Sequence, residues 1–418
     1  MLGASSRAGC GYPLDWEGRM RIMKKRILGL GLATILALGA VSGCGSSKKD
    51  TGNNNAKEVS ITNVSYDPTR ELYKAYNDLF AKHWEEEKGQ KVKVTQSHGG
   101  SGKQALEVAN GLKADVVTLA LEGDVDAVKN AGLIEDGYTE EFPLDSSPYT
   151  SSIVFLVRKG NPKNIQDWDD LIKPGIGVVT PNPKTSGGAR WNYLAAWYYF
   201  EKQGKSEDEI KEAIKQLYKN VVVLDSGARG STTSFVENGQ GDVLLAWENE
   251  AFLSLDEHPG EYEIVVPSAS ILCQPTVAVV DEVVDKRGTR EVATEYLDYL
   301  YSEEAQKLEA KWYYRPSDEK ILKEYAYEGS SNTITEVPKN GKWIITKVDM
   351  TDIKHFGGWT EATKKHFADG GLFDSIYEKQ AFHLCKGEVS VVKIKANSKK
   401  SVIPGFGLSF GIVTAILG

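Results

Sequence analysis

Cysteine and histidine are scarce in this sequence of 418 residues, and their spacing excludes two kinds of site. The four cysteines (Cys10, Cys44, Cys273 and Cys385) are widely separated and form no C-x-x-C pair. We therefore expect neither a disulfide framework nor a zinc site. The six histidines show no H-x3-H spacing, so we predict no metal site and no metal cofactor.

Long basic stretches are also missing. The chain carries 50 Lys and Arg against 58 Asp and Glu, a net charge of -8. Without a basic face, DNA and RNA are not expected partners. The length suits one large two-lobed protein or two to three domains.

The N-terminal apolar run, residues 27–40, is too short for a usual membrane span. It follows the basic residues 23–26 and precedes Val41-Ser42-Gly43-Cys44, which resembles a bacterial lipobox. Cys44 is then the lipidated first residue of the mature protein; the alternative is an ordinary signal peptide cleaved nearby. Residues 1–22 read as a spurious extension ahead of a start at Met23 or Met20, and residues 45–57 as a flexible tether. An exported chain is not expected to use ATP or NAD.

The glycine-rich stretch Ser97–Lys103 lies between a β-like alternation at 91–95 and a helical pattern at 104–110. Free N–H groups and the positive dipole end make such a helix start suitable for an anion. It is not a phosphate-binding P-loop, because Ser97 and Gln104 replace the required Gly and Ser or Thr. It is not a nucleophile elbow either, because Lys103 stands where the last Gly should be. An ordinary capped helix after a tight turn remains the alternative.

The same strand, polar turn and helix start recur at Asp67-Pro68, at 181–188 and at 226–231, and a further strand at 242–246 ends in Trp247. Alternating strands and helices predict an α/β architecture with mainly parallel sheets, in which ligands bind beyond the carboxyl ends of strands. Four such helix starts, without a catalytic or metal constellation, favour a receptor for a small anion.

The groups that these loops offer are hydrogen-bond donors: backbone N–H groups, the hydroxyls of Ser101 and Ser186, and the indole of Trp247. We expect Asp67 to cap its own helix, and no other carboxylate is expected to face the ligand. Sulfate accepts only, whereas hydrogen phosphate carries a proton that needs an acceptor, so this donor set favours sulfate. The neighbouring cations are expected to pair with carboxylates and hold the site's geometry: Arg70, Lys103, Arg190 and Arg229.

Several long motifs resemble bacterial sulfate-binding proteins, the substrate-binding lipoproteins of sulfate/thiosulfate ABC transporters. They are residues 63–73, 96–104, 114–121, 153–162, 180–184, 186–193, 224–232, 246–250 and 356–359, and the similarity spans about 58–377. The resemblance implies a periplasmic-binding-protein-like (type II) fold, with two α/β lobes that close over a cleft. It also implies a ligand set: Asp67, Ser101, Ser186, Gly187, Gly188, Ala228 and Trp247. Asp67, Gly187, Gly188 and Ala228 would contribute backbone amides.

On this resemblance, residues 58–140 and 251–315 form the first lobe, residues 141–250 form the second, and 316–379 pack across them. Two departures from the family pattern stand out. Glu122-Gly123 replaces a small residue and an aromatic, which is expected to loosen the packing near the cleft. Residues 317–350 read as a polar surface insertion. Residues 380–418 resemble the start of a permease subunit and read as a fusion or frame artefact; the alternative is a membrane-anchoring tail.

The sequence thus predicts a lipid-anchored, monomeric receptor on the outer face of the cytoplasmic membrane. Its expected partners are sulfate or thiosulfate, the permease subunits of an importer and their ATPase. No cofactor and no catalysis are expected. Receptors for molybdate or phosphate remain alternatives, as does an ester hydrolase, for which His98 is the histidine near a loop serine; we expect His98 to pack in its turn.

Overall fold

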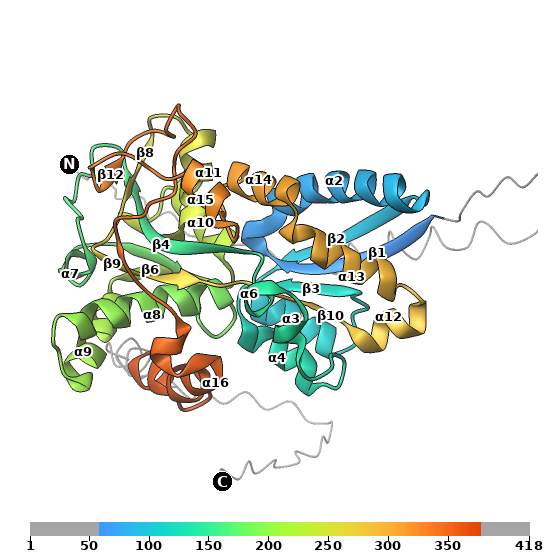
Figure 1. The fold of residues 1–418 in the computed structure, drawn as a ribbon. Helices are drawn as coiled ribbons and strands as arrows, with labels where there is room; N and C mark the ends of the chain where they lie inside the picture. The colour runs from blue at the N-terminus through green and yellow to red at the C-terminus, as the bar shows by residue number, and fades with distance from the viewer. Residues whose placement is uncertain (1–57, 378–418) are drawn as a thin grey trace, which may run out of the picture. The chain divides into compact units, whose positions relative to one another are not determined.

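The computed structural model describes residues 58–377, and the strands there form two sheets (Figure 1). The smaller sheet has the order β10-β3-β1-β2, with β1 (Val59–Tyr66), β2 (Val92–Gly99), β3 (Val116–Leu119) and β10 (Thr276–Val279). Strand β1 runs parallel to β2 and β3, and β10 is antiparallel to β3. We call this sheet and its helices the first lobe.

Alternating apolar residues along these strands fill two cores, one on each face of the sheet. Ile61 and Val116 pack with α2 (Arg70–Lys88), α13 (Arg290–Asp298) and α14 (Glu303–Lys311). Val64 and Val117 pack on the other face with α3 (Ser101–Ala109), α4 (Glu122–Asn130) and α12 (Asp281–Arg287). The period of two is what places neighbouring residues on opposite faces.

The larger sheet has nine strands and follows the order β12-β8-β4-β7-β5-β6. Its centre is β4 (Tyr149–Arg158), antiparallel to β7 (Val243–Trp247) and β8 (Tyr262–Val265), while β5 (Val178–Pro181) runs parallel to β6 (Val221–Asp225) and β7. Strand β12 (Thr333–Ile334) is at one end of this path. Three strands lie off the path: β9 (Ala269–Cys273) and β11 (Arg315–Pro316) pair with β4, and β13 (Asp349–Thr351) pairs with β9. This sheet and its helices are the second lobe.

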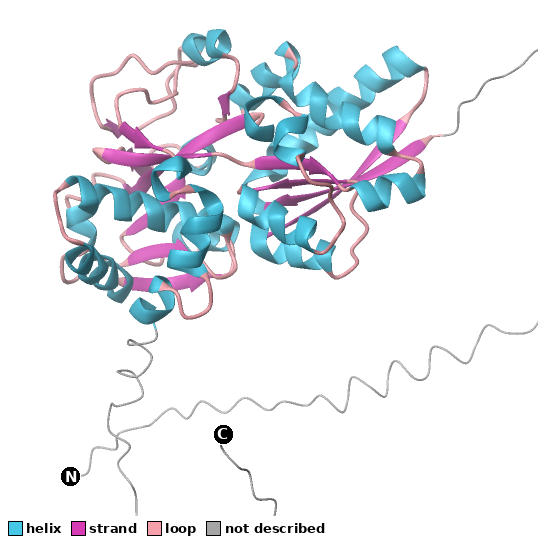
Figure 2. Ribbon diagram, turned by 60° about the horizontal axis from the view of Figure 1, so that its bottom comes forward, coloured by secondary structure: helices cyan, strands magenta, loops and turns pink. Residues whose placement is uncertain are grey.

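Helices cover both faces of the second sheet, as Figure 2 shows. One face packs against α8 (Gly187–Lys202), α9 (Glu207–Lys219) and the C-terminal α16 (Gly358–Ala362). The other packs against α10 (Ala228–Val236) and α11 (Glu248–Glu257). The shorter elements are η1 (Asp67–Thr69), α5 (Tyr138–Glu141), α6 (Pro143–Ser146), α7 (Trp168–Leu171), η2 (Tyr299–Tyr301), α15 (Glu319–Glu324), η3 (Ile353–Phe356) and the π-helical turn η4 (Thr363–Phe367).

The predicted α/β class with two lobes is confirmed, but one lobe boundary is wrong. Residues 251–273 were expected in the first lobe, yet β8 and β9 both pair with β4 in the second. The chain returns to the first sheet only at β10. The buried run at 153–158 was expected to be a parallel strand, whereas β4 is antiparallel to its neighbours. A strand buried on both faces has the same apolar sequence pattern whether its neighbours are parallel or antiparallel.

Residues 317–350 are not simply a surface insertion. The tip at 330–332 is exposed, but Trp343, Ile344 and Ile345 are buried in the core beside α11. The Trp343 indole N–H donates to the Ala310 carbonyl oxygen at 3.0 Å. The prediction was wrong here because three apolar residues within a polar stretch anchor the whole segment.

The departure at Glu122-Gly123 does not loosen the packing. A Cβ on Gly123 would lie 3.5 Å from the Trp359 Cβ, and the Trp359 ring meets that of Trp191 edge to face with 4.6 Å between centroids. Trp359, from the far end of the chain, therefore fills this region.

Three predictions fall on residues outside the described range: lipidation of Cys44, the tether at 45–57 and the permease-like tail at 380–418. Within residues 58–377, no helix is both long and apolar enough to cross a membrane. The same part of the chain holds no group of three or more side chains suited to a metal ion.

Candidate anion-binding site

Four helix starts, two from each lobe, meet at one small cavity. It is lined by residues that begin η1 and α3 in the first lobe and α8 and α10 in the second. The lining residues are Tyr66, Asp67, Pro68, Gly99, Gly100, Ser101, Ser186, Gly188 and Ala228. Because the first N–H groups of a helix have no intrahelical partner, this cavity is surrounded by backbone donors.

Local sequence explains why the helices start here. Tyr66, Gly100, Ser186 and Gly227 are the cap residues, and each has extended backbone, so a strand or loop passes directly into a helix. Tyr66 at the end of β1 pairs with Gly99 at the end of β2. Parallel pairing thus brings the starts of η1 and α3 to the same sheet edge.

The oxygens of the two serine hydroxyls are each held by a backbone N–H group. Ser101 Oγ accepts a hydrogen bond from the Ala120 N–H at 3.0 Å, and Ser186 Oγ accepts from the Ala189 N–H at 3.4 Å. Both side chains are buried. Each hydroxyl can still donate its proton. For Ser101 one acceptor is the buried Asp124 carboxylate: burial raises the pKa of Asp124, and the hydrogen bond from the Ser101 hydroxyl opposes that rise.

Trp247 ends β7 beside a second small cavity that shares Gly188 and Ala228 with the first. Its indole N–H donates to the Gly188 carbonyl oxygen at 3.4 Å, and its ring centroid lies 5.4 Å from that of Tyr66. Six of the seven predicted ligand residues therefore line two adjoining cavities. Gly187 lines neither; a Cβ there would lie 2.7 Å from Asp124 Oδ2.

Glycines allow the two lobes to touch at this point. A Cβ on Gly100 would lie 2.9 Å from the carbonyl oxygens of both Thr185 and Ser226. The Cβ of an alanine at Gly227 would lie 3.5 Å from the Gly100 Cα. At Gly100 the contact between the lobes is thus between backbones.

The four cations near the loops each face a carboxylate, as expected. The pairs are Arg70–Asp67 at 3.8 Å, Lys103–Glu107 at 3.7 Å, Arg190–Asp124 at 3.4 Å and Arg229–Glu71 at 2.6 Å. None of these four cations is among the described residues that line the two cavities.

Asp67 corrects one prediction. Its carboxylate does not cap its own helix; a Cβ on Gly227, across the lobe boundary, would lie only 2.5 Å from Asp67 Oδ2. Burial raises the pKa of Asp67, against the opposing effect of Arg70. The side chain therefore faces the start of α10, while the Asp67 amide stays at the cavity.

Glu250 is the site residue that sequence reasoning missed. It lines the second cavity, is 4 % exposed and accepts a hydrogen bond from Thr232 Oγ1 at 3.1 Å. Burial raises the pKa of Glu250 to about 7. The prediction that no carboxylate other than Asp67 faces the ligand stays a prediction, since Glu250 lines the second cavity and not the first. The sequence feature that could have indicated Glu250 is its position three residues after Trp247.

His98 packs in its turn as expected. Its Nδ1 lies 3.4 Å from the Tyr66 carbonyl oxygen, and burial lowers the pKa of His98 to about 4. His98 and Ser101 make no hydrogen bond to each other: the His98 ring contacts the Tyr66 carbonyl oxygen, and the Ser101 oxygen accepts from the Ala120 N–H.

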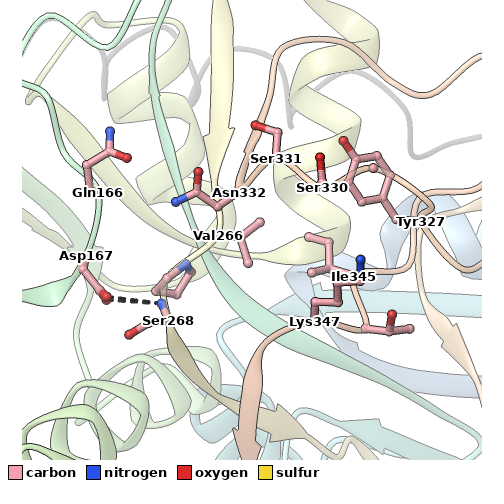
Figure 3. A pocket seen from close by; sticks show the side chains of 13 residues that line it. Gln166, Asp167, Val266, Ser268, Tyr327, Ser330, Ser331, Asn332, Ile345 and Lys347 are labelled. Carbon is pink, nitrogen blue, oxygen red and sulfur yellow. Dashed lines mark hydrogen bonds between the residues drawn. The ribbon is translucent and has the colours of Figure 1, made fainter.

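A larger cavity of about 330 Å³ lies elsewhere in the second lobe (Figure 3). Asp167, Ser268, Asn332 and Lys347 are among the residues that line it, and the Ser268 N–H donates to the Asp167 carboxylate at 3.3 Å. None of the predicted ligand residues reaches it.

The fold and the converging helix starts are those of a solute receptor, and the chain belongs to the bacterial extracellular solute-binding proteins, whose family pattern matches residues 69–315. Its similarity to the sulfate-binding protein of Escherichia coli K12 is 55% identity over 326 residues, covering 78% of this chain and 94% of that protein. The predicted family resemblance is thereby confirmed.

Two further relatives agree with this placement. The thiosulfate-binding protein of Pseudomonas aeruginosa is 46% identical over 320 residues, 76% of this chain and 92% of that protein. The solved structure of the sulfate-binding protein SubI from Mycobacterium tuberculosis has a TM-score of 0.64 at 29% identity, covering 73% of this chain and 98% of that one. All three relatives carry the name of a binding protein.

Proposed function

We propose that this protein captures sulfate or thiosulfate outside the cytoplasm and delivers it to an ABC importer. The observation that carries the proposal is the meeting of four helix N-termini from both lobes at one cavity. The identity with sulfate- and thiosulfate-binding proteins supports the choice of ion.

The donors proposed to hold the anion are the seven predicted residues. The backbone N–H groups of Asp67, Gly187, Gly188 and Ala228, the hydroxyls of Ser101 and Ser186, and the Trp247 indole would surround the oxygens. Helix N-termini stabilise a buried anion without a neighbouring cation. A dianion without a proton suits this set better than hydrogen phosphate. The O–H group of hydrogen phosphate would need an acceptor, and leaving it unpaired would cost about 1–3 kcal/mol.

Closure of the two lobes is part of the proposal. Few chain segments connect the sheets: the one ahead of β4, the one between β9 and β10, and the one ahead of β11. Rotation about these connections would separate Ser101 from Ser186 and let the ion enter. The contacts at Gly100 describe the closed arrangement.

We further propose that the protein acts as a lipid-anchored monomer. Cys44 would carry the lipid, residues 45–57 would provide reach, and the closed receptor would dock on the permease subunits that an ATPase drives. The residues involved in anchoring lie outside the described range.

The test is calorimetric titration of the purified full-length protein with sulfate, thiosulfate, molybdate and phosphate. We expect sulfate or thiosulfate to bind most tightly. Tighter binding of phosphate or molybdate, or no heat with sulfate, would contradict the proposed ligand. Turnover of an aryl sulfate ester would instead favour a hydrolase.

A further inference from the structure

The ammonium group of Lys184 is enclosed by oxygens from residues 358–377, which we call the C-terminal segment. Four of these oxygens lie within hydrogen-bond distance of Nζ: the Phe367 carbonyl at 3.0 Å, the Ala368 carbonyl at 3.3 Å, Asp369 Oδ1 at 3.3 Å and Asp374 Oδ2 at 2.9 Å. The two carbonyls lie at the end of η4, where backbone oxygens lack partners within the turn. Lys184 therefore caps this turn and pairs with the carboxylate of Asp374.

The backbone of Lys184 belongs to the turn that leads into α8 and the anion site. Asn182 organises this turn: its Oδ1 accepts from the Lys184 N–H, and its carbonyl oxygen accepts from the Ser186 N–H, both at 2.9 Å. Ser186 follows Lys184 by two residues, and Gly187 and Gly188 begin α8 directly after it. A shift of the turn at Lys184 would therefore move three of the proposed donor residues.

The C-terminal segment that receives Lys184 also packs against α8 itself (Figure 1). Trp359 meets Trp191 of α8 edge to face, with 4.6 Å between ring centroids, and His366 Nδ1 lies 3.1 Å from the Tyr193 hydroxyl oxygen. All four of these side chains are buried. The segment lies beyond the residues that the family pattern matches. It thus supports α8 along its side, and Lys184 joins it to the turn before the first residue of that helix.

We propose that Lys184 is a positioning residue for the anion site, because it fixes the turn before α8 to the C-terminal segment. This inference rests on the proposed function. Lys184 is not among the described residues that line the two small cavities, so it acts through Ser186 and the amides that follow, and not by contact with the ion. Its charge faces the carboxylates of Asp369 and Asp374. The contribution of Lys184 is therefore to the geometry of the donors and not to the electrostatic field at the ion.

Lys184→Met keeps most of the length of the side chain and removes its charge and hydrogen bonds. Charge-assisted hydrogen bonds are the stronger kind, so the turn before α8 loses a firm tie to the C-terminal segment. We expect a sulfate Kd about 10–100-fold higher than that of the wild type, because the Ser186 hydroxyl and the two amides after it are no longer held in place. The change should lie mainly in faster dissociation of the ion. Lys184→Arg keeps the cation and should recover most of the affinity.

The experiment measures the binding of sodium sulfate to the full-length protein by calorimetry, and its rates by stopped-flow tryptophan fluorescence. Lys365→Met is the matched control. It removes an ammonium group from the same C-terminal segment, but one that is half-exposed and pairs with Glu207 of α9 at 2.9 Å instead of joining the turn before α8. Lys365→Met should bind sulfate within about threefold of the wild type. Thermal unfolding of each ligand-free variant shows whether it is folded.

The outcomes separate the role of Lys184 from the proposed function. A Kd of Lys184→Met within about threefold of the wild type, or an equal loss of affinity in Lys365→Met, overturns the role of Lys184 and leaves the proposed function standing. Absence of sulfate binding by the wild type overturns the proposed function and this inference with it. If Lys184→Met does not fold, Asp374→Asn decides: it removes the carboxylate from the Lys184 ammonium and should also raise the Kd, so an unchanged Kd contradicts the proposal.

Discussion

Gly100→Ala is predicted to weaken sulfate binding while leaving each lobe folded. Gly100 caps α3 with φ -60° and ψ 130°, a backbone conformation that alanine adopts without strain. The added Cβ would lie 2.9 Å from the carbonyl oxygens of Thr185 and Ser226 in the opposite lobe. Both are backbone atoms, so no side-chain rotation relieves the contact.

The magnitude follows from the shift required. An ordinary carbon–oxygen contact begins at about 3.4 Å, so the lobes must separate by about 0.5 Å at this point. A shift of this size lengthens hydrogen bonds between the ion and one lobe, and each bond to a charged group contributes about 1.5–3 kcal/mol. Partial loss of one or two such bonds corresponds to a Kd about 10–100-fold higher.

The assay is calorimetric titration with sulfate, together with thermal unfolding of the ligand-free variant. Gly102→Ala is the matched control: it lies two residues away on the same helix, and its Cβ would lie 3.5 Å from both Asp124 Oδ1 and the Thr185 carbonyl oxygen, an ordinary contact. Gly102→Ala should bind within about threefold of the wild type. Equal affinity of Gly100→Ala and the wild type would refute the idea that the closed arrangement is the binding state.

Three further predictions concern the site, the core and the anchor. Trp247→Phe removes one indole donor and should weaken sulfate binding about tenfold by calorimetry, with the ligand-free variant still folded; unchanged affinity would displace Trp247 from the ligand set. Arg315→Ala leaves the Glu248 carboxylate buried without its partner at 2.6 Å and should lower the free energy of unfolding by about 3–5 kcal/mol in denaturant titrations; a loss below 1 kcal/mol would show that the pair is dispensable. Cys44→Ser should move the protein from the membrane to the soluble fraction, and retention at the membrane would argue against the lipid anchor.

The helix starts could be predicted from sequence because their signals are local. In Ser97–Lys103 and at 226–231, small and polar residues lie between an apolar strand and an apolar-periodic helix. Their meeting point could be inferred because parallel strands end at a common edge.

What could not be predicted depends on partners far away in the chain. Asp67 before a proline is typical of a helix cap, yet Gly227 of the other lobe faces its carboxylate. The burial of Glu250 depends on Thr232 and Arg229 from another helix. The direction of β4 is set by pairing with β7, β8 and β9, and the alternation of apolar residues carries no information on direction.

The charge arrangement explains why a donor-only pocket and buried carboxylates can coexist. Each cation near the loops faces a carboxylate, so the field at the cavity comes mainly from helix N-termini, worth roughly half an elementary charge each. Four such termini, of α3, α8, α10 and the continuous η1–α2, supply roughly two positive charges in total, enough to match a dianion.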